Sequence, residues 1–285
     1  MTFPWLKGHG TENDFVLLPD HDGTVHGNLD GAFVADLCDR RRGIGADGVM
    51  RVIRSEALGT LPIEWGTDAE WFMDYRNSDG SVSEMCGNGI RVFALHLAQE
   101  GLVDADHPIP IGSRDGIKTV TIDPSTGSGQ AVGLISVDMG TPEILATSKI
   151  RVDDHVWEAQ HIATGNPHAV AFVERLSDAG TLIGDPEYDP ETYPDGVNVE
   201  FVVREGDHHV AMRVHERGSG ETRSCGTGAC AVGVAAALAD KADKPVTYQV
   251  DLPGGTVHVT WTENNRMILA GPAVIVARGD MEWLV

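Results

Sequence analysis

The apolar residues of this chain form short strand-like runs and two longer runs that are apolar on nearly every side. The longer runs are residues 90–98, with few polar positions, and residues 229–238, with none. A helix that is apolar all round is buried all round, so these runs predict buried helices over about 89–100 and 229–239. Short apolar runs bounded by turn residues predict strands at 15–18, 49–53, 71–75, 169–173, 197–203 and 210–214.

The remaining segments are turn-rich or follow a strand pattern. Residues 7–14 predict a loop that leads into the first strand, and an amphipathic pattern predicts a helix near 31–41. A chain of 285 residues is long enough for two domains of ordinary size. The predicted fold is therefore a mixed α/β fold of the α+β kind with two similar domains. In each domain a curled, mostly antiparallel sheet wraps around a central helix.

A repeated motif precedes the two buried helices. The sequence reads Met-Cys-Gly-Asn-Gly at 85–89 and Ser-Cys-Gly-Thr-Gly at 224–228. Asn77 precedes Cys86 by the same number of residues as Glu216 precedes Cys225, and an Asn stands near the head of each half, at 13 and 166. These matches indicate a duplication and predict two pseudo-symmetric domains.

The position of each cysteine at a helix start has chemical consequences. The first turn of a helix has unpaired N–H groups and a partial positive charge, which favours a thiolate and lowers the pKa of a cysteine. The same N–H groups can bind a carboxylate, and glycines let a ligand approach the backbone closely. Two opposed thiols suit an enzyme that removes a proton from one face of a carbon and returns one to the other. We expect both helix starts to face the cleft between the halves. The alternative is that Cys-Gly-x-Gly only makes a tight strand-to-helix turn.

Composition excludes several classes of protein. The net charge is −22, from 43 acidic and 21 basic residues, which argues against a nucleic-acid partner. No apolar stretch approaches the length of a membrane span, and residues 1–7 lack the features of a signal peptide. We therefore expect a cytoplasmic protein with no membrane partner.

The number and spacing of the cysteines argue against structural disulfides and a structural zinc site. Four cysteines without a Cys-x-x-Cys pair make a disulfide scaffold or a zinc site improbable, so no metal site is predicted. Cys38 and Cys230 lie inside helical patterns and are expected to pack as small apolar side chains.

Taken together, the motifs make the chain resemble the diaminopimelate epimerase family over nearly its whole length. The motifs are His-Gly-Thr-Glu-Asn-Asp-Phe at 9–15, Gly-Ile-Gly-Ala-Asp-Gly at 43–48, Asn-Ser-Asp-Gly-Ser at 77–81, Met-Cys-Gly-Asn-Gly at 85–89, Gly-Asn-Pro-His at 165–168, Val-Asn at 197–198, Glu-Arg-Gly-Ser-Gly-Glu-Thr at 216–222 and Cys-Gly-Thr-Gly-Ala at 225–229.

The resemblance implies an isomerase that interconverts LL- and meso-2,6-diaminopimelate without pyridoxal phosphate or another cofactor, on the route to lysine and peptidoglycan. It also implies that the last residues return to the first domain. The expected domains are residues 1–138 plus about 273–285, which hold Cys86, and residues 139–272, which hold Cys225.

The resemblance also assigns roles to individual residues. Cys86 and Cys225 would be the acid–base pair, and His168 and Glu216 would tune the pKa values of the thiols. The residues implied to bind the substrate are Asn13, Asn77, Asn166, Asn198, Glu216 and Arg217, with Gly87, Asn88, Gly226 and Thr227 at the carboxylate of the reacting carbon.

Each assigned side chain also has a simpler interpretation. Arg217 suits a distal carboxylate through its planar fork, but it could equally be a surface arginine paired with Glu216 or Glu221. A single Asn is often only a turn residue, and His168 could be a loop histidine with satisfied hydrogen bonds. Two positions depart from the family pattern. Thr11-Glu12 fills the place before Asn13, and Gly48 replaces a glutamine.

Two other functions remain open from the sequence. A proline racemase or hydroxyproline epimerase also uses paired cysteines, but it would not need Arg217 and the asparagine set. A non-catalytic thiol switch could join Cys86 to Cys225 in a disulfide, but it would not need carboxylate-binding glycine turns. The expected partner is a small amino-acid substrate, and the oligomeric state is left open, with a homodimer as one possibility.

Overall fold

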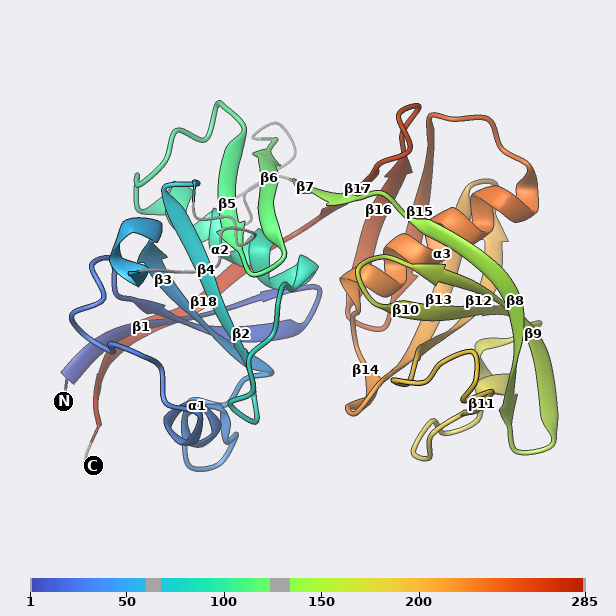
Figure 1. The fold of residues 1–285 in the computed structure, drawn as a ribbon, viewed down its shortest axis with the longest axis horizontal. Helices are drawn as coiled ribbons and strands as arrows, with labels where there is room; N and C mark the ends of the chain where they lie inside the picture. Colours follow the sequence, from blue (N-terminus) through green and yellow to red (C-terminus); the bar gives the residue numbers. More distant parts are fainter. Residues whose placement is uncertain (1, 60–67, 124–133, 284–285) are drawn as a thin grey trace. The chain divides into compact units, whose positions relative to one another are not determined.

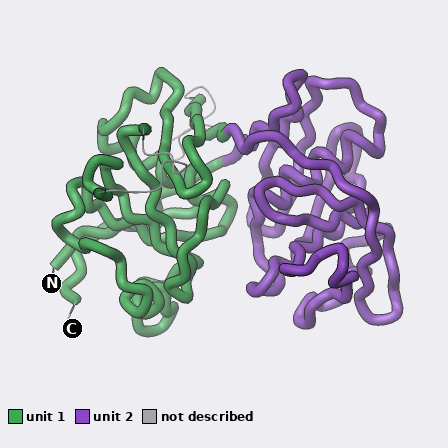
Figure 2. The backbone as a smooth tube through the Cα atoms, viewed as in Figure 1, with its two compact units in different colours: residues 1–137, 272–285 green, residues 138–271 purple. Residues whose placement is uncertain are grey.

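The chain divides into two compact units, each described here by itself. The computed structural model describes residues 2–59, 68–123 and 134–283. One unit, unit 1, comprises residues 1–137 and 272–285, and the other, unit 2, comprises residues 138–271 (Figure 2). The chain passes from unit 1 to unit 2 within β7 (Ile135–Gly140) and returns between β17 (Met267–Gly271) and β18 (Val274–Glu282).

The sheet of unit 1 runs in the order β18-β1-β2-β3-β4-β5-β6-β7. Neighbouring strands are antiparallel except for the pairs β2–β3 and β4–β5, which are parallel. Its further elements are β1 (Thr2–Gly10), β2 (Asn13–Pro19), α1 (Gly31–Cys38), β3 (Gly48–Arg54), η1 (Ser55–Leu58), β4 (Trp71–Asn77), α2 (Gly87–Gln99), β5 (Ile109–Ser113) and β6 (Gly116–Ile122).

Unit 2 repeats this plan, with strands in the order β8-β9-β10-β12-β13-β15-β16-β17. The pairs β10–β12 and β13–β15 are parallel and the others in this order are antiparallel. Its elements are β8 (Glu143–Val152), β9 (His155–Ala163), β10 (Pro167–Phe172), η3 (Leu176–Ala179), β11 (Glu187–Tyr188), β12 (Asn198–Gly206), β13 (His209–Glu216), β14 (Gly220–Thr222), α3 (Gly226–Asp240), β15 (Val246–Leu252) and β16 (Gly255–Trp261).

A buried helix forms the centre of each unit (Figure 1). Every residue of α2 from Gly87 to Leu97 is buried, and the helix packs against β18, β1, β2 and β3 as well as β6 farther along the sheet. A sheet whose separated strands contact one helix must curl around it. Helix α3 is buried in the same way, and Gly233 lets it approach β16, since a methyl group there would lie 2.8 Å from Val259 Cβ.

The two units therefore match in strand order and in the places of their parallel pairs. They also match in the buried helix, which follows β4 in unit 1 and β14 in unit 2. The predicted fold, two curled sheets each around a central helix, is confirmed. Within the part of the chain that the structure describes, no helix combines the length and the apolar run that a membrane crossing needs.

The prediction of a loop over residues 7–14 was wrong. Strand β1 continues to Gly10, and only Thr11 and Glu12 form the turn to β2, with φ angles of 51° and 64°. Two consecutive positive φ angles suit a two-residue hairpin, because their twist matches that of the strands. The helix predicted near 31–41 ends earlier, at Cys38.

Candidate active site

Each motif cysteine is the N-cap of a central helix. Cys86 caps α2 with φ −137° and ψ 117°, and Cys225 caps α3 with φ −124° and ψ 114°. The sulfur atoms accept hydrogen bonds from Gly89 N at 3.4 Å and Gly228 N at 3.3 Å. The two halves thus present their thiols on the same backbone geometry, beside the positive ends of two helices.

Amide side chains surround the thiol of unit 1. The half-buried Cys86 has its Sγ 3.6 Å from Asn13 Oδ1, which also accepts a hydrogen bond from Asn88 Nδ2 at 3.2 Å. Asn13 Nδ2 in turn donates to Asp47 Oδ2 at 2.8 Å. Because its nitrogen is bound to Asp47, Asn13 turns its oxygen toward the thiol. Asn88 is buried, and its side chain is held by Asn13.

Asp47 is itself held by a charged cluster. Arg40 bridges Asp14 and Asp47 at 2.7 Å each, and Lys7 lies 2.8 Å from Asp14. Burial acts to raise the pKa of Asp14, but hydrogen bonds from Arg40 and Lys7 outweigh it and lower that pKa to about 2. This cluster fixes the carboxylate that orients Asn13.

The thiol of unit 2 is more deeply buried and lies among carboxyl groups. Cys225 is 5% exposed, and its Sγ lies 3.5 Å from Thr227 Oγ1. Burial, followed by the charges of Glu216 and Glu200, raises the pKa of Cys225 well above its usual value. The expectation that the helix start lowers this pKa was wrong here, because loss of hydration outweighs the hydrogen bond from Gly228.

A buried pair of ionisable groups lies beside Cys225. His168 on β10 and Glu200 on β12 are both fully buried, and His168 Nδ1 is 2.6 Å from Glu200 Oε1. The other ring nitrogen, Nε2, is 2.9 Å from Asn166 Oδ1. His168 therefore lies in a strand and not in a loop, and its two ring nitrogens contact Glu200 and Asn166.

The polar residues at the end of β13 form a second group. Asn198 Oδ1 accepts a hydrogen bond from the backbone N–H of Arg217 at 2.8 Å, which holds the turn after Glu216. The exposed Arg217 donates from Nη1 to the Asp195 carbonyl at 2.6 Å. Glu216 accepts from the Thr222 hydroxyl.

Within the described part of the chain, Arg217 is not paired with Glu216 or Glu221, the two surface partners suggested by the sequence. Glu221 forms a two-pronged ion pair with Arg213, at 2.6 and 2.9 Å, and Glu216 is bound as described above. The guanidinium of Arg217 is held by a carbonyl group instead.

The corresponding end of β4 carries Asn77, whose Nδ2 donates to Ser81 Oγ at 3.0 Å. Gly48 pairs with Asn77 across the sheet. A methyl group at Gly48 would lie 2.6 Å from Tyr75 Cε2, so the Tyr75 ring occupies the space of a side chain at 48. The Tyr75 ring thus fills the space beside position 48, where this chain has glycine instead of the family's glutamine.

Two polar residues of the site, Glu200 and Asp47, were missed by the sequence analysis. Glu200 stands in the apolar run 197–203, and a lone carboxylate in a predicted buried strand is the signal that could have found it. Asp47 lies in the glycine-rich motif at 43–48, but its partner Asn13 is visible only in the folded chain.

The other two cysteines lie in the core as expected. Cys38 and Cys230 are buried, and burial raises the pKa of Cys38 to about 12. Among the described residues, no three His, Cys, Asp or Glu side chains are placed to hold a metal ion.

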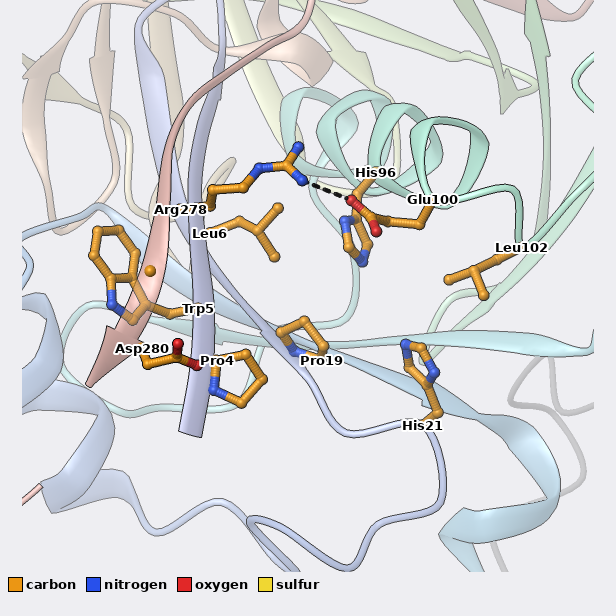
Figure 3. A pocket seen from close by; sticks show the side chains of 11 residues that line it. Pro4, Trp5, Leu6, Pro19, His21, His96, Glu100, Leu102, Arg278 and Asp280 are labelled. Atoms are coloured by element: carbon orange, nitrogen blue, oxygen red, sulfur yellow. Dashed lines mark hydrogen bonds and ion pairs between the residues drawn. The ribbon is translucent and has the colours of Figure 1, made fainter. Parts of the chain in front are cut away.

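A cavity of about 560 Å³ lies in unit 1 beside the end of α2 that is opposite Cys86. Arg278 donates to Glu100 at 3.1 Å at its edge, and burial lowers the pKa of His96 to about 4 (Figure 3). Its lining includes none of the residues assigned to the thiol chemistry. The lining residues are Pro4, Trp5, Leu6, Pro19, His21, His96, Glu100, Leu102, Arg278, Gly279 and Asp280.

Comparison with solved structures shows the same fold in distant proteins. A PhzF-family phenazine biosynthesis protein from Bacillus anthracis matches with a TM-score of 0.69 and 15% identity, over 99% of this chain and 100% of that one. A hydroxyproline epimerase from Agrobacterium vitis, with bound trans-4-hydroxy-L-proline, matches with a TM-score of 0.69 and 14% identity, over 98% of this chain and 92% of that one.

Comparison of sequences is more specific. The chain is 50% identical over 293 residues to the diaminopimelate epimerase of Streptomyces coelicolor, covering 98% of this chain and 96% of the relative. It is 46% identical over 280 residues to that of Thermobifida fusca, covering 97% of each. The family model described as diaminopimelate epimerase matches residues 5–145 and 161–282. With matches of this identity and coverage, the chain belongs to the diaminopimelate epimerase family.

Proposed function

We propose that this protein is an isomerase that interconverts LL- and meso-2,6-diaminopimelate, with Cys86 and Cys225 as the two acid–base groups. The observation that carries the proposal is the pair of matched N-cap thiols, together with family membership. A two-base epimerisation uses one thiolate to remove the α-proton and one thiol to protonate the opposite face. The protonated state favoured at Cys225 by burial suits the donor role in this form of the protein.

The helix starts supply the stabilisation that an amino-acid α-carbanion needs. Negative charge grows on the substrate carboxylate as the proton leaves, and fixed N–H dipoles aimed at that charge lower the barrier. The backbone N–H groups of Gly87 and Asn88, and of Gly226 and Thr227, belong to first turns of helices. We assign them to the carboxylate of the reacting carbon. On this account no cofactor is required as an electron sink.

The remaining polar residues are assigned to the amino-acid ends of the substrate. Asn13, Asn77, Asn166, Asn198, Glu216 and Arg217 offer the mixture of donors and acceptors that a zwitterion requires. The exposed guanidinium of Arg217, at the end of β13, suits the distal carboxylate. His168 and Glu216 influence the Cys225 side of the reaction, His168 through Glu200 and Glu216 through its charge.

The second candidate is a racemase or epimerase of proline or hydroxyproline. A specific observation favours keeping it, because the solved structures of the same fold include a hydroxyproline epimerase. Arg217 and Glu216 argue against it, since a small cyclic amino acid has no distal carboxylate or ammonium group to occupy them. Parallel assays with proline and diaminopimelate decide between the two substrates.

Two further features belong to the proposal, a cytoplasmic location and a homodimer. A reducing compartment keeps thiols available for acid–base chemistry, which supports the first. The second is tested by the mass of the protein in solution, measured by sedimentation.

The decisive experiment follows the proton in deuterated water. Purified protein is mixed with LL-diaminopimelate, and both isomers are separated by chiral chromatography and analysed early by mass spectrometry. With two thiols, the first meso product carries deuterium at the inverted carbon, while unreacted LL substrate keeps its protium. Product that retains substantial protium at that carbon would exclude opposed partners, and absence of any meso product would exclude the activity.

A further inference from the structure

A carboxyl group that is not among the residues assigned to substrate binding lies in the interior of unit 2. Glu200 is fully buried in β12, and successive strand residues face opposite sides of a sheet, so Glu200 shares a face with Asn198. The neighbouring strand β10 runs parallel, with His168 opposite Asn198, and His168 Nδ1 reaches Glu200 Oε1 at 2.6 Å. A fully buried carboxyl group is costly unless it has a function or a partner.

Glu200 also reaches the helix that carries the thiol. A methyl group at Gly228 would lie 2.7 Å from Glu200 Oε1 and 3.2 Å from Cys225 Sγ. The glycine of the Cys-Gly-x-Gly motif therefore makes room for this carboxyl group. Glu200 and Cys225 both contact the first turn of α3, so the charge on Glu200 matters to the thiol.

The hydrogen-bond partners of His168 indicate how many protons the pair holds. Asn166 presents Oδ1, which has no hydrogen, to His168 Nε2 at 2.9 Å, so Nε2 carries a proton. The contact between His168 Nδ1 and Glu200 Oε1 needs one more hydrogen. Either Glu200 is protonated beside a neutral ring, or an ionised Glu200 faces an imidazolium, and both forms share one proton and have no net charge.

The surroundings of Glu200 agree with this count. Burial raises the pKa of the Glu200 carboxyl group. Its second oxygen, Oε2, has no hydrogen-bond partner among the described residues, a state that costs less for a neutral acid than for a carboxylate. Of the two carboxyl groups that raise the pKa of Cys225, Glu216 has the larger effect, ahead of Glu200.

We propose that Glu200 is a positioning residue that acts through His168, so that one shared, buried proton turns the amide NH2 group of Asn166 toward the substrate. An amide whose oxygen accepts from His168 has its nitrogen directed away from the ring, where it can donate to a carboxylate. The inference rests on the proposed function, because it assigns Asn166 to substrate binding.

Loss of the shared proton would reverse the orientation. An ionised Glu200 accepts from Nδ1–H, which leaves Nε2 as an acceptor that binds the Asn166 NH2 group and turns Oδ1 outward. Substrate binding should therefore weaken as the pH rises and the pair loses its proton. The other titratable groups nearby are Glu216 on β13, Cys225 at the start of α3, His161 on β9 and Tyr193. Variants that change only Glu200 and His168 leave all of these groups unchanged.

The corresponding positions of unit 1 provide a matched control. Phe15 pairs with Gly48 as His168 pairs with Asn198, so Phe15 and Met50 stand where unit 2 has His168 and Glu200. A methyl group at Gly89 would meet Met50 Sδ and Phe15 Cζ. This fold thus accepts an apolar pair behind a helix-start thiol, and the double variant His168→Phe/Glu200→Met should fold.

The kinetic test compares Glu200→Gln, Glu200→Met and that double variant. A glutamine can donate to Nδ1 without an ionisable proton, so Glu200→Gln should keep KM within about threefold and lose the rise of KM at high pH. Glu200→Met and the double variant should raise KM about 10- to 100-fold, the effect of one lost hydrogen bond to a charged ligand, with a smaller change in kcat. The inference is overturned if a folded Glu200→Met or double variant keeps the wild-type KM, or if Glu200→Gln is as impaired as they are.

A second measurement needs neither substrate nor activity. In 15N-labelled wild-type protein near neutral pH, the His168 ring, assigned by its loss in His168→Phe, should show a protonated Nε2. A ring protonated only on Nδ1 overturns the inference whatever the kinetics show. If wild-type protein forms no meso product while Nε2 is protonated, the proposed function fails and the proton count of the pair stands.

Discussion

Cys86 and Cys225 cap corresponding helices in the two units, but the side chains behind them differ in polarity. Met50 and Phe15 lie behind the helix start of unit 1, whereas Glu200 lies behind that of unit 2, joined to His168. Cys86 is half-buried and contacts an amide oxygen, and Cys225 is buried among carboxyl groups.

After the duplication, the backbone arrangement was preserved and the side chains near each helix start changed. Strand order, parallel pairs and N-cap geometry are the same in both units, because they follow from backbone hydrogen bonding and a buried central helix. The side chains facing each helix start diverged without disturbing that backbone. The divergence gives the two thiols different proton affinities, and a two-base reaction begins with one thiol protonated and the other ionised.

Removal of either sulfur should have the largest effect on activity. Cys86→Ala and Cys225→Ala should each lower kcat by at least ~10³-fold, because an acid–base group contributes about 10²–10⁴-fold. Steady-state epimerisation assays in both directions measure the effect, with circular dichroism as the control for folding. Wild-type turnover in either variant would show that its sulfur is not an acid–base group.

A second difference between the units lies at the residue after Asn77 or Glu216, eight residues before each cysteine. Unit 1 has Ser78 there and unit 2 has Arg217. Arg217→Lys keeps the charge but loses the planar fork, so it should weaken substrate binding by roughly 1–3 kcal/mol. The matched variant Ser78→Ala should leave KM nearly unchanged. Equal KM values for Arg217→Lys and the wild type would place Arg217 outside the substrate site.

Gly89 and Gly228, the corresponding glycines in the first turns of the two helices, differ in their neighbours. A methyl group at Gly228 would lie 2.7 Å from a carboxyl oxygen held by His168, whereas at Gly89 it would meet Met50 Sδ at 3.0 Å. The end of a methionine side chain can move, but Glu200 cannot move without losing its partner. Gly228→Ala should therefore cost about 1–3 kcal/mol of unfolding free energy, and Gly89→Ala should cost less than about 1 kcal/mol. Urea unfolding of both variants measures this, and equal losses would contradict it.

The smallest effect concerns the reactivity of the thiols. The raised pKa of Cys225 keeps its reactive thiolate scarce at neutral pH, and the thiolate fraction grows only as the pH rises toward that pKa. Each unit by which the pKa rises lowers the thiolate fraction at neutral pH about tenfold. Iodoacetamide should therefore label the buried Cys225 at least ~10-fold more slowly than the half-buried Cys86 at pH near 7, and the labelling of Cys225 should speed up at higher pH. Peptide mass spectrometry follows both sites, with urea-unfolded protein as the control. Faster labelling of Cys225 would reverse the proposed asymmetry.

Much of the fold could be predicted because its signals are local. The uniformly apolar runs at 90–98 and 229–238 became the buried helices α2 and α3, and the repeated Cys-Gly-x-Gly motif became the N-caps. The loop predicted over 7–14 failed because a two-residue hairpin with positive φ at Thr11 and Glu12 carries no glycine signal.

Periodicity and turn residues act over a few neighbouring positions, so the sequence predicts the two-fold repeat, the central helices and the cysteine at each helix start. The protonation and the hydrogen bonding around each cysteine depend on the folded chain. The link from Glu200 through His168 to Asn166 joins β12 to β10 and the turn before it. The high pKa of Cys225 arises from burial and from the nearby Glu216 and Glu200. Proton affinity depends on hydration and on charges brought close by folding, and residues far apart in the chain carry no local sign of either.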